Sequence, residues 1–189
     1  MRNPKVQMLV EAGLMLALAM ILSNIVMFRM PAGGSVTLGS MIPILIFSMR
    51  WGWQSGVFVG VVFGLLQMAF GGYVVSVPQA ILDYPLAFGF IGLAGLGKNK
   101  VKASVMNGTF EGIKVISVWT VIAIFLRFLS HVASGLLFFS DGLSLLSPAT
   151  WWISISYNGG FLLVETIIAA AILSVIGKPV MTVYLQKKM

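Results

Sequence analysis

The sequence predicts an all-α integral membrane protein, a single domain over residues 1–189 that is built as a bundle of six transmembrane helices. This prediction comes from the composition, the spacing of apolar runs and the placement of basic residues. Hydrophobic residues make up 59% of the chain and charged residues only 9%, and the mean hydropathy is +1.01. A soluble domain of this length has too small an interior to bury that much apolar side chain.

Apolar runs of about the length that crosses the hydrocarbon core define the helices. They fall at residues 7–27, 37–49, 52–70, 78–97, 108–139 and 151–175. The first run is expected to be a retained helix, because no small-residue cleavage site of a signal peptide follows it. The second run is short for a complete crossing. Glycine, proline and serine enrich most of the connections, and the lysine-bearing segment 98–107 is expected to be a connection as well.

Basic residues are distributed unevenly between the two sides of such a bundle. Six crossings place both ends of the chain on one side, and only Arg29 falls in the connections of the other side. The basic residues on the first side are Arg2, Lys5, Arg50, Lys98, Lys100, Lys102, Lys178, Lys187 and Lys188. Because cytoplasmic loops are enriched in lysine and arginine, both termini are expected to be cytoplasmic.

The composition argues against several classes of function. With no cysteine, one histidine and five carboxylates, neither disulfides nor a metal centre is expected. The basic residues are not interleaved with aromatic ones, so no nucleic acid is expected as a partner. The chain has no nucleophile elbow and is not expected to be an enzyme. It also has no phosphate-binding loop, so ATP-driven transport would require an ATPase on another chain.

Three polar residues are expected at one depth in the membrane. Asp83, His131 and Asn158 each lie roughly 8–12 Å below the outer surface, at about 1.5 Å per helical residue. This common depth predicts a cavity open to the outside. Asp83 is the single acid in the apolar run 73–97, and an ionised carboxylate there usually marks a partner or a pathway. It is expected either to bind a cationic or amino-bearing solute, or to cap a helix or pair with Arg127.

The neighbouring residues allow two interpretations each. His131 is expected either to bind the solute or to form an ordinary hydrogen bond between helices. Tyr73, Tyr84 and Trp151 suit the aromatic belt at a membrane surface, and they also suit the stacking of a planar cationic ring. Asn158 has both a donor and an acceptor with which it could bind one edge of a heterocycle.

Two further pairs of residues are predicted to act together. Arg127 and Glu165 lie at matching depths on sequence-adjacent helices, and isolated charges are costly in hydrocarbon, so an ion pair beneath the cavity is expected. Gly13 and Ala17 are small residues one helical turn apart, a spacing that lets another membrane helix pack closely.

Four stretches of the chain together resemble a known family. They are GGSVTLGSMIPILIFSMRWGWQSGVFVG, GGYVVSVPQAILDYPLAF, LRFLSHVASGLLFF and SISYNGG. Their acid-Tyr pair, Arg-x-x-x-His run and Tyr-Asn-Gly sequence resemble the thiamin-specific S components of energy-coupling-factor transporters, over nearly the whole chain. The resemblance implies a six-helix protein of the bacterial cell membrane that binds thiamin near the outer face. It also implies coupling to a membrane scaffold subunit and two cytoplasmic ATPases.

The resemblance also implies roles for individual residues. Gly13 and Ala17 fall where the family docks on its scaffold subunit. The implied thiamin-binding positions are Tyr73, Asp83, Tyr84, His131, Phe139, Trp151 and Asn158. The chain departs from the family by having no tryptophan near Gly34 or at Phe63 and Phe139, and Trp151 is expected to substitute in part.

The sequence therefore favours a subunit that captures thiamin for ATP-driven uptake, with three alternatives. The first is an S component for another vitamin, such as a hydroxymethylpyrimidine or pantothenate. The second is a stand-alone secondary transporter, which normally needs more helices or an inverted repeat. The third is an intramembrane enzyme, for which the chain has no nucleophile and base in a suitable arrangement.

Overall fold

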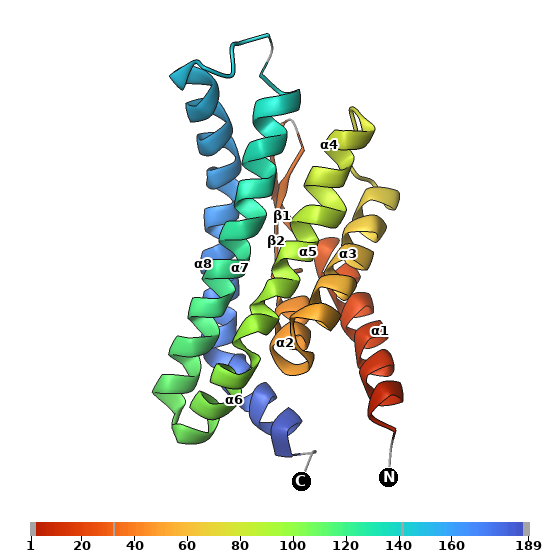
Figure 1. Ribbon diagram of the computed structural model, residues 1–189, viewed down its shortest axis with the longest axis vertical. Coiled ribbons are helices and arrows are strands. Elements are labelled where there is room, and N and C mark those ends of the chain that lie inside the picture. The colour runs from red at the N-terminus through yellow and green to blue at the C-terminus, as the bar shows by residue number, and fades with distance from the viewer. Residues whose placement is uncertain (1–2, 32, 141, 187–189) are drawn as a thin grey trace.

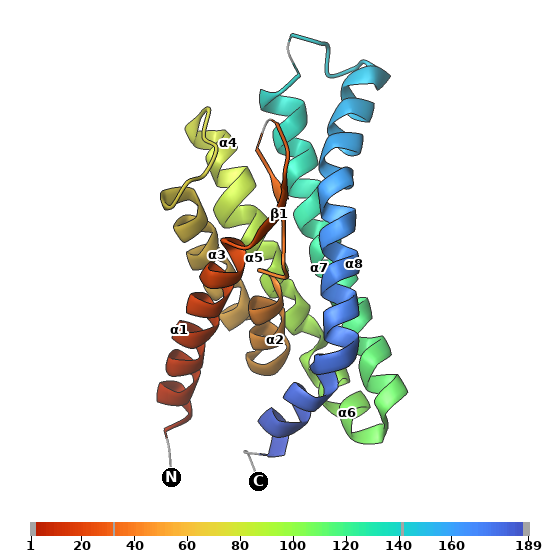
Figure 2. The same cartoon turned by 180° about the vertical axis from the view of Figure 1, so that it is seen from behind.

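The elongated bundle of the computed structural model covers residues 3–31, 33–140 and 142–186. Its helices run side by side, and the start of α1 and the end of α8 lie at the same end of the bundle (Figures 1 and 2). At the opposite end lie the turn of a β-hairpin and the connection between α7 and α8 (Figure 1). Arg2, Lys187 and Lys188 of the expected basic side lie outside the described residues.

The elements follow one another with short connections. Their order is α1 (Pro4–Ser23), β1 (Val26–Arg29), β2 (Ser35–Thr37), α2 (Ile42–Trp51), α3 (Trp53–Ala69), α4 (Val77–Ile81), the π-helical turn η1 (Leu82–Leu86), α5 (Ala87–Ile91), the 3₁₀ segment η2 (Gly92–Gly97), α6 (Lys98–Asn107), α7 (Thr109–Phe138) and α8 (Pro148–Gln186). The segments from α4 to α6 form one continuous helical stretch.

Four helical stretches in the described part of the chain are long and apolar enough to cross a membrane. They are Pro4–Ser23, Val77–Asn107, Thr109–Phe138 and Pro148–Val183. The two other apolar helices, Ile42–Trp51 and Trp53–Ala69, are shorter, with 10 and 17 residues. The chain is thus a membrane protein dominated by helices.

A short β-hairpin replaces the expected end of the first helix and the expected start of the second. Val26–Arg29 pairs antiparallel with Ser35–Thr37, so the predictions of helix over 24–27 and over 37–41 are wrong. Asn24 caps α1, and its backbone N–H already bonds back into the last turn. Gly33 and Gly34 adopt φ values of 86° and 80°, a conformation that glycine reaches without strain and that closes the turn.

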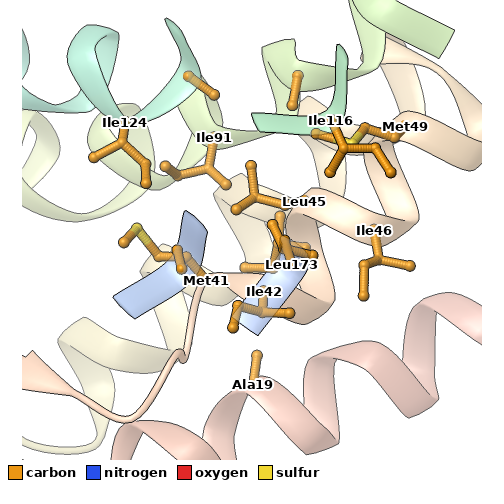
Figure 3. Close-up of a cluster of buried hydrophobic side chains, with 14 of the residues drawn as sticks. Ala19, Met41, Ile42, Leu45, Ile46, Met49, Ile91, Ile116, Ile124 and Leu173 are labelled. Atoms are coloured by element: carbon orange, nitrogen blue, oxygen red, sulfur yellow. The ribbon is translucent and has the colours of Figure 1, made fainter. Parts of the chain in front are cut away.

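The helix α2 lies in the centre of the molecule. All residues from Ile42 to Arg50 are buried, as expected for a helix that is apolar on every side. Met41, Leu45 and Met49 pack there against side chains of α1, α5, α7 and α8 (Figure 3). With 10 residues, α2 is shorter than the roughly 20 residues of a straight helical crossing. The apolar run 37–49 thus contains a short buried helix, and its assignment as one of six transmembrane helices stays a prediction.

Two helices extend beyond their predicted bounds. The segment 98–107, expected to be a connection, forms α6, because nothing in it interrupts a helix before Gly108, whose φ is 156°. The last helix begins at Pro148 and continues to Gln186 rather than ending at residue 175. It bends near its end (Figure 2), where Pro179 removes a backbone donor from inside the helix.

Candidate functional site: a polar cavity between the hairpin and the helix ends

A cavity of about 860 Å³ lies between the hairpin and the helices around it. Its walls come from β1 and β2, the ends of α1 and α3, the α4–η1 segment, α7 and the first turns of α8. The hairpin turn and the α7–α8 connection both line it, so it lies at the end of the bundle away from the start of α1 (Figure 1). Its volume is within the roughly 300–1,000 Å³ of small-molecule sites.

Close packing between α3 and the continuous helical stretch Val77–Asn107, here called the composite helix, fixes the position of Asp83. Gly56, Gly60 and Gly64 follow one another at four-residue spacing, and a Cβ at any of them would collide with a backbone carbonyl of the composite helix. At Gly64 that carbonyl belongs to Tyr84, next to Asp83. Asp83 itself lies in the π-helical turn η1, which contains Pro85. Single π-helical turns of this kind are frequent at functional sites.

The Asp83 carboxylate accepts hydrogen bonds from three side chains. Its Oδ2 accepts from Gln79 Nε2 at 2.6 Å and from Ser134 Oγ at 2.8 Å. Its Oδ1 lies 2.9 Å from Nδ1 of His131. The carboxylate lines the cavity, and 16% of its side-chain surface remains exposed there. It therefore has partners within the protein and is still within reach of a ligand.

A chain of buried polar contacts leads from Asp83 to the hairpin. Arg127 Nε donates to His131 Nε2 at 3.3 Å, and Arg127 Nη1 forms an ion pair with Glu165 Oε2 at 2.9 Å. Glu165 Oε1 accepts from the backbone N–H and the hydroxyl of Thr37 in β2, at 3.1 and 2.7 Å. Arg127 is thus paired with Glu165, as the matching depths predicted, rather than with Asp83.

With both carboxylates ionised, the network of Asp83, His131, Arg127 and Glu165 has one more negative than positive charge. The guanidinium can only donate, so His131 Nε2 is an acceptor and Nδ1–H donates to Asp83; the histidine is the neutral tautomer. Two carboxylates, Asp83 and Glu165, then face the single cation of Arg127. Among the described residues that line the cavity, the other cation is Arg29, exposed on β1.

Aromatic side chains form part of the wall near Asp83. Tyr84 Oη accepts from the backbone N–H of Tyr73 at 2.6 Å, which holds the two tyrosines together. The ring of Tyr73 stacks on that of Phe139 with centroids 6.2 Å apart. All three line the cavity, so this wall offers ring faces to a planar ligand.

Asn158 joins the site through the backbone of α7. Its Nδ2 donates to the carbonyls of His131 and Ser154, at 3.2 and 2.9 Å. The amide nitrogen is thus engaged by protein, while its carbonyl oxygen accepts nothing from the described residues. Phe161, one turn further along α8, meets the edge of the His131 ring at a centroid distance of 5.8 Å.

Two aromatic residues considered from the sequence lie elsewhere. Trp151 is not among the described residues that line the cavity; its side chain is 48% exposed and its indole N–H donates to the carbonyl of Leu145. Its expected role as a ligand contact stays a prediction that this arrangement of the cavity does not support. Phe63 is fully buried against Phe88 and belongs to the core rather than to the cavity.

The sequence pattern did not single out Gln79 and Thr37. Gln79 donates a hydrogen bond to Asp83, and Thr37 donates two to Glu165. Gln79 is 1% exposed and lies one helical turn before Asp83 in an otherwise apolar run. Two polar residues four positions apart lie on the same side of a helix, so this spacing could have predicted their contact. Thr37 offered no such signal, because its contact with Glu165 joins residues 128 positions apart in the chain.

The helix α1 has an exposed surface of small and apolar residues. Gly13 and Ala17 are exposed on it, and no atom lies within 4 Å of the position that a Cβ of Gly13 would take. Leu14 and Leu18 are exposed beside them, whereas Ala19 packs into the core. One side of α1 therefore offers small and apolar residues to the surroundings.

The fold and the cavity define a helical membrane protein with a polar internal cavity of small-molecule size. The sequence model of the thiamine transporter protein family matches residues 9–184, and the chain belongs to this family. This is a family of transporters, so the protein is not an enzyme.

Individual relatives agree with this assignment. The thiamine transporter ThiT of Bacillus subtilis is 36% identical over 170 residues, which cover 87% of each chain. ThiT of Lacticaseibacillus paracasei is 31% identical over 150 residues, 72% of this chain and 70% of the relative. A solved structure of ThiT from Listeria monocytogenes superposes with a TM-score of 0.84 at 28% identity, covering 96% of this chain and 99% of that one.

Proposed function

We propose that this protein binds thiamin in the cavity beside Asp83 and serves as the substrate-capturing S component of an energy-coupling-factor transporter. The observation that supports it most directly is the Asp83 carboxylate, which lines the cavity and whose hydrogen-bond partners are the neutral side chains of Gln79, Ser134 and His131. Thiamin has a permanently cationic thiazolium ring and an aminopyrimidine edge. A carboxylate beside aromatic ring faces suits both.

The proposed contacts use the cavity residues in distinct roles. Asp83 accepts from the amino group or offsets the thiazolium charge, and the rings of Tyr73, Tyr84 and Phe139 provide stacking surfaces. The carbonyl oxygen of Asn158 accepts from the heterocycle. His131 and Arg127 fix the orientation of the Asp83 carboxylate, and the ion pair with Glu165 forms the polar floor beneath the ligand.

A titration of the purified protein with thiamin tests this proposal. Binding can be followed by the intrinsic fluorescence of the five tryptophans and by calorimetry. Thiamin should bind far more tightly than an analogue without the thiazolium charge or than hydroxymethylpyrimidine. Failure of thiamin to bind, or equal binding of the uncharged analogue, would contradict the assignment.

The coupling to partners and the membrane topology belong to the same proposal. Six crossings, with α2 and α3 counted as helices that enter the membrane, leave both termini cytoplasmic. The exposed small residues Gly13 and Ala17 on α1 suit close packing against a scaffold subunit, which in turn holds two ATPases. A Gly13→Trp, Ala17→Trp double variant should still bind thiamin but lose co-purification with the scaffold. Normal co-purification would exclude this docking face.

A further inference from the structure

A second hollow lies outside the thiamin cavity, between α6 and α7. It has a volume of about 450 Å³ and is formed largely by α7. The lining residues are Lys100, Glu111, Lys114, Val115, Val118, Trp119 and Ile122. Because α6 lies at the end of the bundle where α1 starts (Figure 1), this hollow, here called the α6–α7 groove, is far along the bundle from the hairpin.

The polar end of the α6–α7 groove is built around Trp119. The ring of Trp119 packs directly on Gly97, where a Cβ would collide with it. The ammonium of Lys100 lies 6.0 Å from the centroid of the same ring, within the range of a cation–π contact. Because Gly97 has no side chain, the indole of Trp119 can pack against the start of α6. Lys100 on α6 therefore lies beside this ring, in the groove.

The charges of Lys100 and Lys114, which line the groove, can attract an anion. Neither Lys100 nor Lys114 takes part in the ion pairs that the described residues form. Glu111 also lines the groove, so the three charges sum to one positive. By contrast, Lys178 at the same end donates to the hydroxyl of Thr109, and Lys102 on α6 does not line the groove.

The other end of the groove is apolar and faces outward. Val118 and Ile122 are 48% and 41% exposed, and Phe125, one turn further, is exposed as well. In a membrane protein such a row of exposed apolar side chains contacts lipid. The groove therefore joins a surface for an acyl chain to a pair of cations, with an indole between them. This is the arrangement expected at the boundary between hydrocarbon and headgroups.

We propose that the α6–α7 groove binds an anionic phospholipid, with the headgroup phosphate between Lys100 and Lys114 and an acyl chain along Val118 and Ile122. Basic pockets between transmembrane helices are known to suit anionic headgroups. The lipid supplies both an anion and an apolar chain, and so it fits this groove better than a soluble anion does. The inference is independent of what the other cavity binds.

Native mass spectrometry of the detergent-purified protein tests the proposal. Phosphatidylglycerol and phosphatidylcholine with identical acyl chains are added in turn, and inorganic phosphate is added in a separate arm. Wild type should retain phosphatidylglycerol in preference to phosphatidylcholine. Lys100→Gln and Lys114→Gln should each weaken that retention roughly 5-fold, and the double variant should lose the preference. Lys102→Gln is the matched control on the same helix and should behave as wild type.

The outcomes separate the proposal from its alternatives. Both target lysines are exposed, so the variants should keep their fold, which a thermal unfolding curve checks. Equal loss in Lys102→Gln would mean that the helix attracts anionic lipid through diffuse charge, and would overturn the site. Displacement of phosphatidylglycerol by millimolar phosphate would identify a soluble-anion site and overturn the assignment to lipid.

Discussion

At the scale of single residues, Asp83 combines two roles that looked like alternatives in the sequence. Its carboxylate has three protein donors, so the apolar helix can hold it without a ligand. Those donors, however, are neutral side chains: Gln79, Ser134 and the neutral tautomer of His131. Hydrogen bonds to neutral donors orient a carboxylate and leave its charge in place, so a cation in the cavity is still attracted.

Asp83→Asn removes this charge and keeps a similar side-chain volume. We expect thiamin affinity to fall by about 1–3 kcal/mol, the range for a buried hydrogen bond to a charged group. Asp83→Glu keeps the charge and should lose less. Calorimetric titration gives both affinities, and an unfolding curve shows whether each variant is folded. An unchanged affinity in folded Asp83→Asn would exclude the contact.

Glu165 has a different role from Asp83, because it holds three groups at once: Arg127 and both donors of Thr37. It is 4% exposed, so its loss leaves the buried cation of Arg127 without a counter-ion. Glu165→Met should lower the free energy of unfolding by roughly 3–5 kcal/mol, measured in detergent. The double variant Arg127→Met, Glu165→Met should recover part of this loss. Additive losses would show that the two charges are not coupled.

At the scale of elements, hydropathy predicted long helices well and short elements poorly. The run 108–139 became α7 (Thr109–Phe138), and the run 52–70 became α3 (Trp53–Ala69). Hydropathy detects a long apolar segment whatever its neighbours are. It could not separate the strand Val26–Arg29 from the helix before it, because a short apolar run has no decisive period. Nor did it distinguish α2, apolar because it is buried, from a helix in contact with lipid.

The same limit applies to the candidate site. The position of a residue along its helix predicts its depth in the membrane. The three residues expected at one depth, Asp83, His131 and Asn158, are connected by hydrogen bonds in the structure. Rotation about the helix axis is set by packing, which depth does not report. The outward direction of Trp151 and the contact between Thr37 and Glu165 therefore required the three-dimensional arrangement.

The glycine row of α3 is the element that fixes this arrangement near the cavity. Gly64→Ala should push Tyr84 and Asp83 away from α3, because the added Cβ meets the Tyr84 carbonyl. We expect a stability loss of about 1–3 kcal/mol from overpacking, together with weaker thiamin binding. Gly160→Ala is the matched control, since no atom lies within 4 Å of its Cβ position. If both variants bind thiamin like wild type, the close approach does not position the site.

At the scale of the whole molecule, the lysines of α6 and the polar cavity lie at opposite ends. The lysines of α6 are at the end where α1 starts, and the proposed thiamin cavity is next to the hairpin and the α7–α8 connection (Figure 1). Lysine-rich segments remain on the cytoplasmic side during insertion. In the proposed orientation, with both termini cytoplasmic, the cavity at the other end faces the outside, where a nutrient would be captured. Orientation in the membrane is thus the property on which the direction of uptake depends.

This orientation can be measured on the protein almost unaltered, because the chain contains no cysteine. Leu146, in the α7–α8 connection, is 93% exposed, and Lys102 is exposed on α6. Between them lies α7, whose 30 residues are enough for one crossing. In intact cells, a membrane-impermeant maleimide should label Leu146→Cys and leave Lys102→Cys unlabelled until the membrane is opened. Neither position lines the thiamin cavity, so thiamin binding serves as the check that both variants are folded. The reverse labelling pattern would place the cavity on the cytoplasmic side and contradict capture from outside.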